Sequence, residues 1–235
     1  MVVAIIAGRG GVGKTSQLFY LAKIIDNFRW AVMEKKDEQA ISEGDNLYKK
    51  DAKYMADPVA ILNAFQEWRD TVLKEENDVI VIDGVTDLRT YAIDEWITKD
   101  NKKRGEDGRE PRTKIGKNNI SAWEEINTRV KLLIQPIMNF AFFNNIHLFM
   151  TAQMKPLYIN DIRTGDEIAI KEWLEYDVEC LLILHKDKNT EHYWCSCEKA
   201  PLWSDGCFKE DLRKETGLLE VLGMHGLLDQ KEEEE

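Results

Sequence analysis

A glycine-rich segment near the start of the chain carries the residue types that bind phosphate. Residues 8–15 read Gly-Arg-Gly-Gly-Val-Gly-Lys-Thr and match the pattern G-x-x-x-x-G-K-[ST] in full. Glycines let successive backbone N–H groups turn around an anion, because no Cβ atoms interfere. The pattern assigns Lys14 to the β- and γ-phosphates of a nucleotide and the Thr15 hydroxyl to Mg²⁺. The residues expected to bind the nucleotide are Gly8, Arg9, Gly10, Gly11, Val12, Gly13, Lys14, Thr15 and Ser16.

The segments on either side of this loop have the composition that phosphate binding requires. Residues 2–6 are apolar and mostly β-branched, which predicts a buried strand, and residues 14–27 show apolar positions at helical spacing. The amino end of that helix adds the positive end of a dipole to the loop. This strand–loop–helix context distinguishes the motif from a tight turn that contains a lysine by chance.

An acidic residue that suits the same site comes later in the chain. Asp83 ends the apolar run of residues 78–83, and a run that is hydrophobic on both faces predicts a central parallel strand. Open α/β sheets bind ligands at the carboxyl ends of such strands. We therefore expect Asp83 to hold the Mg²⁺ shell; the alternative is an aspartate that only caps the following helix.

The order of predicted elements indicates an α/β fold. Strand and helix patterns alternate, which predicts a mostly parallel sheet flanked by helices, and the final two strands predict a hairpin. The strands are expected near residues 2–6, 30–34, 78–83, 146–152, 178–184 and 193–198, and the helices near 14–27, 58–74, 88–97, 120–143 and 210–223. We expect residues 1–209 to form the core, and residues 210–235 to form a C-terminal helix and an acidic tail.

Composition restricts the possible partners. The chain has 235 residues and a net charge of −11, so any contact with nucleic acid must use a local basic patch. Apolar runs are shorter than the ~20 residues that span a bilayer, and residues 2–6 are not followed by a cleavage site, so we expect a cytoplasmic protein without a membrane partner. Four cysteines (Cys180, Cys195, Cys197 and Cys207) are expected to be reduced thiols. A metal site of Cys195, Cys197 and His192 is the weaker alternative, because the cysteine spacing fits zinc poorly.

Several segments resemble the RecA-type and KaiC-type P-loop ATPases. "VIVIDGVTDL" resembles their Walker B segment, with Gly84 in place of a serine. "HLFMTAQMKP" resembles their next strand, and the resemblance implies that Gln153 senses the γ-phosphate. The order of these pieces also fits that family, which implies a RecA-like central sheet.

Two further residues are assigned by weaker resemblance. "WAVMEKKDEQ" resembles the strand that ends near the glutamate that polarises water, which implies this role for Glu34; Asp37 and Glu38 are alternatives. "SCEKAP" resembles a late hairpin whose lysine reaches the nucleotide of a neighbouring subunit, which implies this role for Lys199. Arg9 and Lys186 are the alternative cations.

The likeness is strongest to the small phage and archaeal-virus RecA-like ATPases, including the single-strand-annealing group. It implies an enzyme that binds and hydrolyses ATP with Mg²⁺, acts on single-stranded DNA in recombination or annealing, and assembles into a ring or filament in the host cytoplasm. An ATPase that drives a protein partner, as in viral packaging or assembly, is an alternative. A ParA/MinD-like switch is another, because "RGGVGKT" resembles the loop of that group with Arg9 in place of its lysine.

Two segments could couple the nucleotide site to a partner. Residues 98–119 contain eight lysines and arginines and four acidic residues, a net charge of +4, without apolar periodicity. They are expected to form a long loop that suits a nucleic-acid backbone, a kinase-like lid, or only a solvated loop. Residues 154–174 follow Gln153, where RecA-like proteins carry a DNA-contacting loop; Tyr158 could stack on a base. A protein contact or a short hairpin around residues 163–166 is equally compatible.

Overall fold

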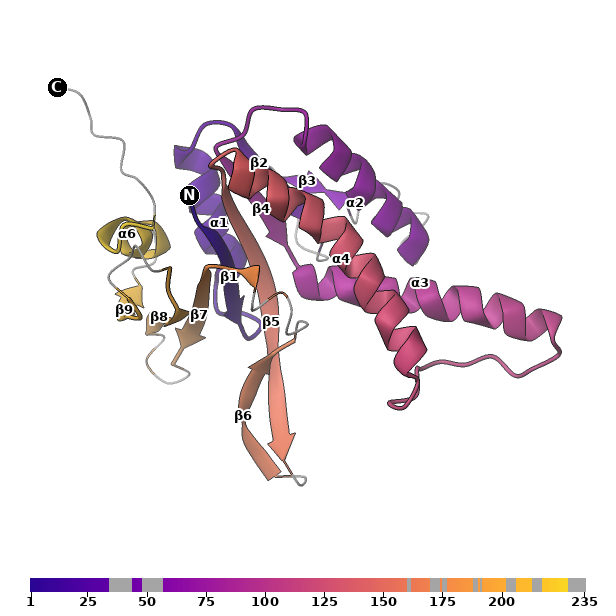
Figure 1. Ribbon diagram of the computed structural model, residues 1–235. Helices are drawn as coiled ribbons and strands as arrows, with labels where there is room; N and C mark the ends of the chain where they lie inside the picture. The colour runs from indigo at the N-terminus through magenta and orange to yellow at the C-terminus, as the bar shows by residue number, and fades with distance from the viewer. Residues whose placement is uncertain are drawn as a thin grey trace.

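A mostly parallel β-sheet forms the centre of the computed structural model (Figure 1), with strand order β3-β2-β4-β5-β1-β7-β8-β9. Neighbours from β3 to β7 pair in parallel, whereas β7–β8 and β8–β9 pair antiparallel. The strands are β1 (Val3–Gly8), β2 (Phe28–Val32), β3 (Asp45–Asn46), β4 (Val79–Asp83), β5 (His147–Ile159), β6 (Ile162–Ile168), β7 (Cys180–Lys186), β8 (Tyr193–Lys199) and β9 (Lys209–Leu212). The structure describes residues 1–33, 44–47, 57–159, 162–169, 174, 177–187, 190, 192–201, 206–212 and 217–227.

Helices cover both faces of this sheet. They are α1 (Lys14–Ile24), α2 (Pro58–Val72), α3 (Val85–Glu106), α4 (Ile120–Phe143) and α6 (Gly217–Met224). Side chains alternate along β1, so Val3, Ile5 and Ala7 join the core under α2, α3 and α4. Val2, Ala4 and Ile6 join the other core, under α1 and α6. The strand is therefore buried on both faces, as its unbroken apolar sequence requires.

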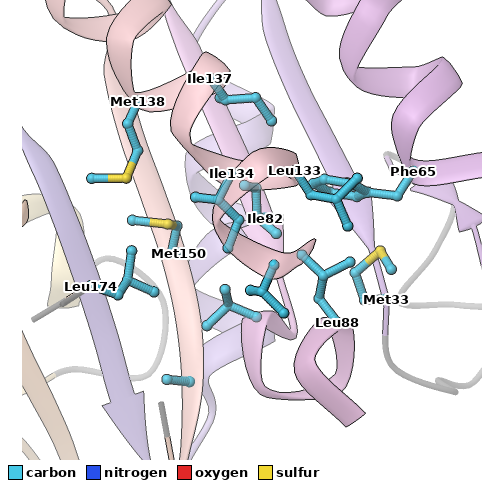
Figure 2. Packing of buried hydrophobic residues seen from close by; sticks show 14 of the residues in the cluster. Met33, Phe65, Ile82, Leu88, Leu133, Ile134, Ile137, Met138, Met150 and Leu174 are labelled. Atoms are coloured by element: carbon cyan, nitrogen blue, oxygen red, sulfur yellow. The ribbon is translucent and has the colours of Figure 1, made fainter. Parts of the chain in front are cut away.

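The larger core lies between α4 and the central strands. Figure 2 shows Ile134 and Met138 of α4 facing Ile82 of β4 and Met150 of β5. These four side chains are at most 5% exposed. Close packing at this position holds the carboxyl end of β4 in a fixed relation to residues 150–151 of β5.

Local signals set the helix starts. Asp57 caps α2 by accepting a hydrogen bond from the Val59 N–H at 3.0 Å, and Pro58 occupies the first turn. Asn119 caps α4 in the same way through the Ala122 N–H, at 3.4 Å. Helix α1 instead has Gly13 as its N-cap residue, whose φ of 87° lies in the left-handed region.

Most predicted elements are confirmed, including the hairpin of β7 and β8. The helix predicted over residues 210–223 is wrong in its first part. Residues 209–212 form β9, and α6 begins only at Gly217. Strand β8 offers unpaired backbone groups at its edge, and pairing with them outweighs the local helical preference of this polar segment.

The prediction of a loop over residues 98–119 is also wrong in part, because α3 continues to Glu106. The ion pair between Lys99 and Glu95, at 2.9 Å and four residues apart, supports this polar end of the helix. The remainder of the segment is held against α3. Asn101 exchanges two hydrogen bonds with the backbone of Arg112, at 2.7 and 2.8 Å, and Ile115 is buried.

Residues 154–159 extend β5 and pair antiparallel with β6, and Figure 1 shows these two strands extending beyond the sheet. The hairpin expected as one alternative is therefore present. Its closing pair is Ile159 and Ile162, so residues 163–166 lie within β6 and not at the turn. None of the helices in the described ranges combines the length and apolar character needed to cross a bilayer.

Candidate nucleotide-binding site

The glycine-rich loop connects β1 to α1, and its shape depends on three of its glycines. Gly11 and Gly13 have φ angles of 77° and 87°, which residues with a side chain rarely adopt. A Cβ on Gly8 would lie 2.6 Å from Cγ2 of Val12 and 2.9 Å from the carbonyl oxygen of Leu184. The loop can therefore keep this path only with glycine at these positions.

Lys14 lies inside the curve of this loop. Its side-chain ammonium donates hydrogen bonds to the carbonyl oxygens of Gly8 at 2.9 Å and Arg9 at 3.2 Å. The residue is only 8% exposed, so a positive charge is held at the carboxyl end of β1 with little solvent around it. A cation with little solvent around it attracts phosphate oxygens more strongly than a surface lysine does.

Asp83 lies beside the start of α1, at the carboxyl end of β4. The Thr15 hydroxyl donates to Oδ2 of Asp83 at 3.2 Å, and the Thr151 hydroxyl donates to Oδ1 at 2.5 Å. Asp83 and Thr151 are both 0% exposed. Two residues that the motifs single out 68 positions apart thus come within hydrogen-bond distance.

The oxygen atoms of Thr15 and Asp83 fit a magnesium ion. Mg²⁺ prefers hard oxygen ligands and commonly takes only one or two from the protein, the others coming from phosphate and water. A hydroxyl and a carboxylate oxygen 3.2 Å apart provide such a pair at the start of α1. The donor set is therefore compatible with a nucleotide-bound magnesium ion.

Gln153 lies on the neighbouring strand β5, in register with Gly8. Its N–H donates to the Thr86 hydroxyl of α3 at 3.0 Å, and its carbonyl accepts the Ala169 N–H at 2.8 Å. Gln153 is therefore close to the loop in the sheet and is also linked to the segment that follows the β5–β6 hairpin.

Glu34 lies outside the described residues, as do Asp37 and Glu38, so their predicted role stays a prediction. The preceding residue, Met33, is held by two hydrogen bonds. The Met33 N–H donates to the Asp83 carbonyl at 2.9 Å, and the Tyr91 hydroxyl donates to the Met33 carbonyl at 2.9 Å. Met33 is thus fixed next to Asp83.

Solved structures resemble this chain over most of its length. The crystal structure of the RadB recombinase matches 91% of this chain and 88% of its own, with a TM-score of 0.50 and 11% identity. The fold is RecA-like. A KaiC-like protein from the hyperthermophilic archaeon Pyrococcus horikoshii OT3 also matches, over 91% of this chain and 87% of its own, with a TM-score of 0.48 and 11% identity. Searches of protein-family models and of curated protein sequences give no match.

Arg9 connects the loop of this RecA-like fold to the hairpin. Its guanidinium forms an ion pair with Asp166 of β6, with Arg9 Nε 2.9 Å from Asp166 Oδ2. The Arg9 side chain is 44% exposed. The sequence left open whether Arg9 is solvated or binds phosphate. The structure adds a third possibility, an ion pair with Asp166 of the hairpin.

Lys199 contacts its own chain. Its ammonium donates to the carbonyl of Val178, and in the sheet order its strand, β8, is separated from β1 by β7. The alternative cation Lys186 lies over the ring of Tyr193, 5.1 Å from the centroid. The predicted action of Lys199 on a neighbouring subunit stays a prediction.

Three of the four cysteines are buried. Cys180, Cys195 and Cys197 are buried in the core under α1 and α6, and Cys207 is exposed. The Sγ atoms of Cys180 and Cys197 are 3.9 Å apart, and burial raises the pKa of Cys195 to about 12. Among the residues that the structure describes, no cluster of histidine, cysteine and acidic side chains is arranged to hold a metal ion.

The sequence did not predict three residues that contact the candidate site, namely Thr151, Thr86 and Asp166. One signal pointed to Thr151, since it is two residues before Gln153 and strand alternation places both on one face of β5. The contacts of Thr86 and Asp166 depend on how β5, β6 and α3 pack together. No short pattern around those two residues indicates these contacts.

Proposed function

We propose that this chain is a Mg²⁺-dependent ATPase of RecA type that acts on single-stranded DNA in recombination or annealing of the phage or viral kind. The observation that carries the proposal is the grouping of Lys14, Thr15 and Asp83 at one edge of the sheet, with the Thr15 hydroxyl 3.2 Å from the Asp83 carboxylate. A buried cation next to two oxygen ligands is what a magnesium–nucleotide complex requires.

Each residue has a distinct task in this proposal. Lys14 and the backbone N–H groups of the loop bind and orient the phosphates, while Thr15 and Asp83 hold the magnesium ion. The ion, when bound, offsets the negative charge of the phosphates. Glu34 orients the attacking water and accepts its proton, and Gln153 donates a hydrogen bond to the γ-phosphate without adding a charge.

Assembly is a further part of the proposal. A cation supplied by a neighbouring subunit can accelerate phosphoryl transfer by ~10³ or more, and Lys199 is assigned this task. In this structure its ammonium donates a hydrogen bond to the backbone carbonyl of Val178. In the assembly, a phosphate of the nucleotide bound to a neighbouring subunit would replace that carbonyl as the acceptor. The proposed active form is thus a homo-oligomeric ring or filament, located in the cytoplasm of the cell or of a viral host.

The DNA contact is assigned to residues 98–119, which we name the basic arm. Asp100 pairs with Arg112 at 2.8 Å and Asp107 with Arg109 at 3.6 Å, which neutralises part of its charge. Four exposed lysines of the arm make no ion pair with any described residue, namely Lys102, Lys103, Lys114 and Lys117. Four lysines without an ion pair, in a segment of net charge +4, support contact with phosphate groups.

A protein partner is the second candidate, and the β5–β6 hairpin favours it. Lys155 and Glu167 pair at 3.1 Å and Arg9 pairs with Asp166, so charged groups of the hairpin neutralise one another or the loop. Ile162 next to its turn is 68% exposed. An exposed apolar side chain at this position suits contact with another protein better than contact with a DNA backbone.

The test compares ATP hydrolysis by the wild type, Lys14→Ala and the control Lys23→Ala, each with and without single-stranded DNA. Lys23 is on the same helix but at its exposed far end. The proposal expects hydrolysis that DNA stimulates, that Lys14→Ala abolishes and that Lys23→Ala leaves unchanged. Lys14-dependent hydrolysis that ignores DNA would favour the protein partner. Wild-type protein without hydrolysis under either condition would contradict the ATPase assignment.

A further inference from the structure

Thr151 makes two buried hydrogen bonds at the candidate site that have defined directions. Its hydroxyl oxygen lies 2.8 Å from the Gly84 backbone nitrogen and 2.5 Å from Oδ1 of Asp83. The Gly84 N–H can only donate, so the hydroxyl accepts from it. The single hydroxyl proton therefore points to Asp83, since a carboxylate oxygen is an acceptor.

These hydrogen bonds fix the orientation of the Asp83 carboxylate. Oδ1 is tied to Thr151, while Oδ2 faces the Thr15 hydroxyl at 3.2 Å. Strands β4 and β5 pair with Asp83 opposite Thr151, so the hydroxyl approaches from a rigid neighbouring strand. A buried carboxylate held at one oxygen by such a strand cannot rotate freely, which leaves the second oxygen directed at the start of α1.

We propose that Thr151 is a positioning residue for magnesium, which holds the Asp83 carboxylate so that only Oδ2 is offered to the ion. The proposal rests on the function proposed above, because it requires a magnesium–nucleotide site at Asp83. Thr151 acts through Asp83, and the effect is confined to the metal-dependent part of nucleotide binding. Hydrogen bonds to metal ligands commonly change metal affinity by about 10- to 100-fold when they are removed.

The experiment measures the affinity for a fluorescent ADP analogue in Mg²⁺ and in EDTA, with the full chain. Thr151→Val keeps the side-chain shape but removes the hydroxyl, Thr151→Ala removes it without the added methyl group, and Thr151→Ser restores it. Thr90→Val is the matched control, because Thr90 is an exposed residue of α3 whose hydroxyl donates to the Thr86 carbonyl, away from Asp83. Thermal unfolding of each variant accompanies the binding data.

The expected result is specific to the metal. Wild type, Thr151→Ser and Thr90→Val bind more tightly in Mg²⁺ than in EDTA, whereas this gain falls about tenfold or more in Thr151→Val and Thr151→Ala. Their affinity in EDTA stays unchanged. A full Mg²⁺ gain in Thr151→Val overturns the positioning role and leaves the proposed function intact.

Two other results also overturn the proposal. An equal loss of affinity in EDTA and in Mg²⁺, in both the Val and the Ala variants, assigns Thr151 a purely structural role. A wild type that binds no nucleotide, or binds it without a Mg²⁺ gain, removes the proposed function and the role of Thr151 together.

Discussion

Arg9 of the glycine-rich loop and Asp166 of β6 form an ion pair, with Arg9 Nε 2.9 Å from Asp166 Oδ2. The pair joins the loop to a hairpin that extends beyond the sheet (Figure 1). Arg9 is one of the residues predicted to bind the nucleotide, so we expect a bound nucleotide and Asp166 to compete for the same guanidinium.

Replacing Asp166 by Asn is therefore expected to tighten nucleotide binding. The Arg9 side chain is 44% exposed, and exposed pairs contribute up to about 1 kcal/mol, so the gain in affinity should be about fivefold or less. Titration calorimetry with ATP and Mg²⁺ at low salt measures it, and added salt should reduce it.

The double variant is the control for this competition. Asp166→Asn should have no effect in an Arg9→Ala background, where the guanidinium is absent. An equal gain in both backgrounds would show that Asp166 acts on phosphate directly, by general charge repulsion, and not through Arg9.

The glycine-rich loop offers a matched test of packing. Gly8→Ala places a Cβ 2.9 Å from the Leu184 carbonyl and 2.6 Å from Val12, whereas Gly10 has open space around it. Overpacking of this kind costs about 1–3 kcal/mol, so Gly8→Ala should lower the unfolding free energy by that amount. Chemical denaturation should give Gly10→Ala an unfolding free energy within about 0.5 kcal/mol of the wild-type value. Equal stability of the two variants would mean that the loop path is different.

His185 predicts a pH-dependent stability. It stacks on Trp194 with ring centroids 3.5 Å apart and lies 3.1 Å from the Ser196 hydroxyl. Burial lowers the pKa of His185; Glu198 opposes this and Lys209 adds to it. The pKa of a histidine in the unfolded chain is about 6.5. Below this pH the unfolded chain therefore binds a proton that the folded chain does not, and the free energy of unfolding falls as the pH falls.

The variant His185→Gln has no imidazole to bind this proton in the unfolded chain. Its unfolding free energy should therefore change less with pH below about 6.5. Urea denaturation between pH 8 and pH 5 measures both proteins. A variant whose stability falls as steeply as that of the wild type over this range would rule out the histidine as the cause.

The four unneutralised lysines of the basic arm should determine DNA binding. Replacing Lys102, Lys103, Lys114 and Lys117 by Gln is expected to weaken binding to single-stranded DNA and to reduce its salt dependence. The logarithmic slope should fall by about 0.7 for each lysine that contacts a phosphate. Fluorescence anisotropy across a salt series measures both quantities.

A double variant, Lys23→Gln with Lys74→Gln, is the control. Lys23 lies in the last turn of α1 and Lys74 lies just beyond the carboxyl end of α2, so both are exposed lysines outside the basic arm. Equal losses in the control and in the arm variant would contradict a specific contact through the basic arm.

The sequence predicted elements whose signal is local. The loop between β1 and α1, the unbroken apolar run of β4 and the β7–β8 hairpin each follow from a short pattern. β6 and β9 lack such patterns, because "IRTGDEI" and "KEDL" form strands only where β5 and β8 offer backbone partners. The polar end of α3 was missed for a similar reason, since it has no apolar periodicity.

The residues of the candidate site likewise divide into those that a local motif predicts and those that strand pairing brings to the site. Lys14, Thr15 and Asp83 were named from motifs that each span a few residues, and the structure brings them together. Thr151 contacts Asp83 through the pairing of β5 with β4, whereas Asp166 contacts Arg9 of the neighbouring loop through the pairing of β5 with β6. Such contacts depend on the register of distant strands, which residue types alone do not determine.

The most direct test of the central claim is a calorimetric titration of ATP with Mg²⁺ into the wild type and into Lys14→Ala. The site predicts one ATP per chain in the wild type, and a loss of about 10- to 100-fold in affinity when the buried ammonium and its charged hydrogen bonds are removed. Wild-type protein that does not bind ATP, or a Lys14→Ala variant that binds it equally well, would contradict a nucleotide site at this edge of the sheet.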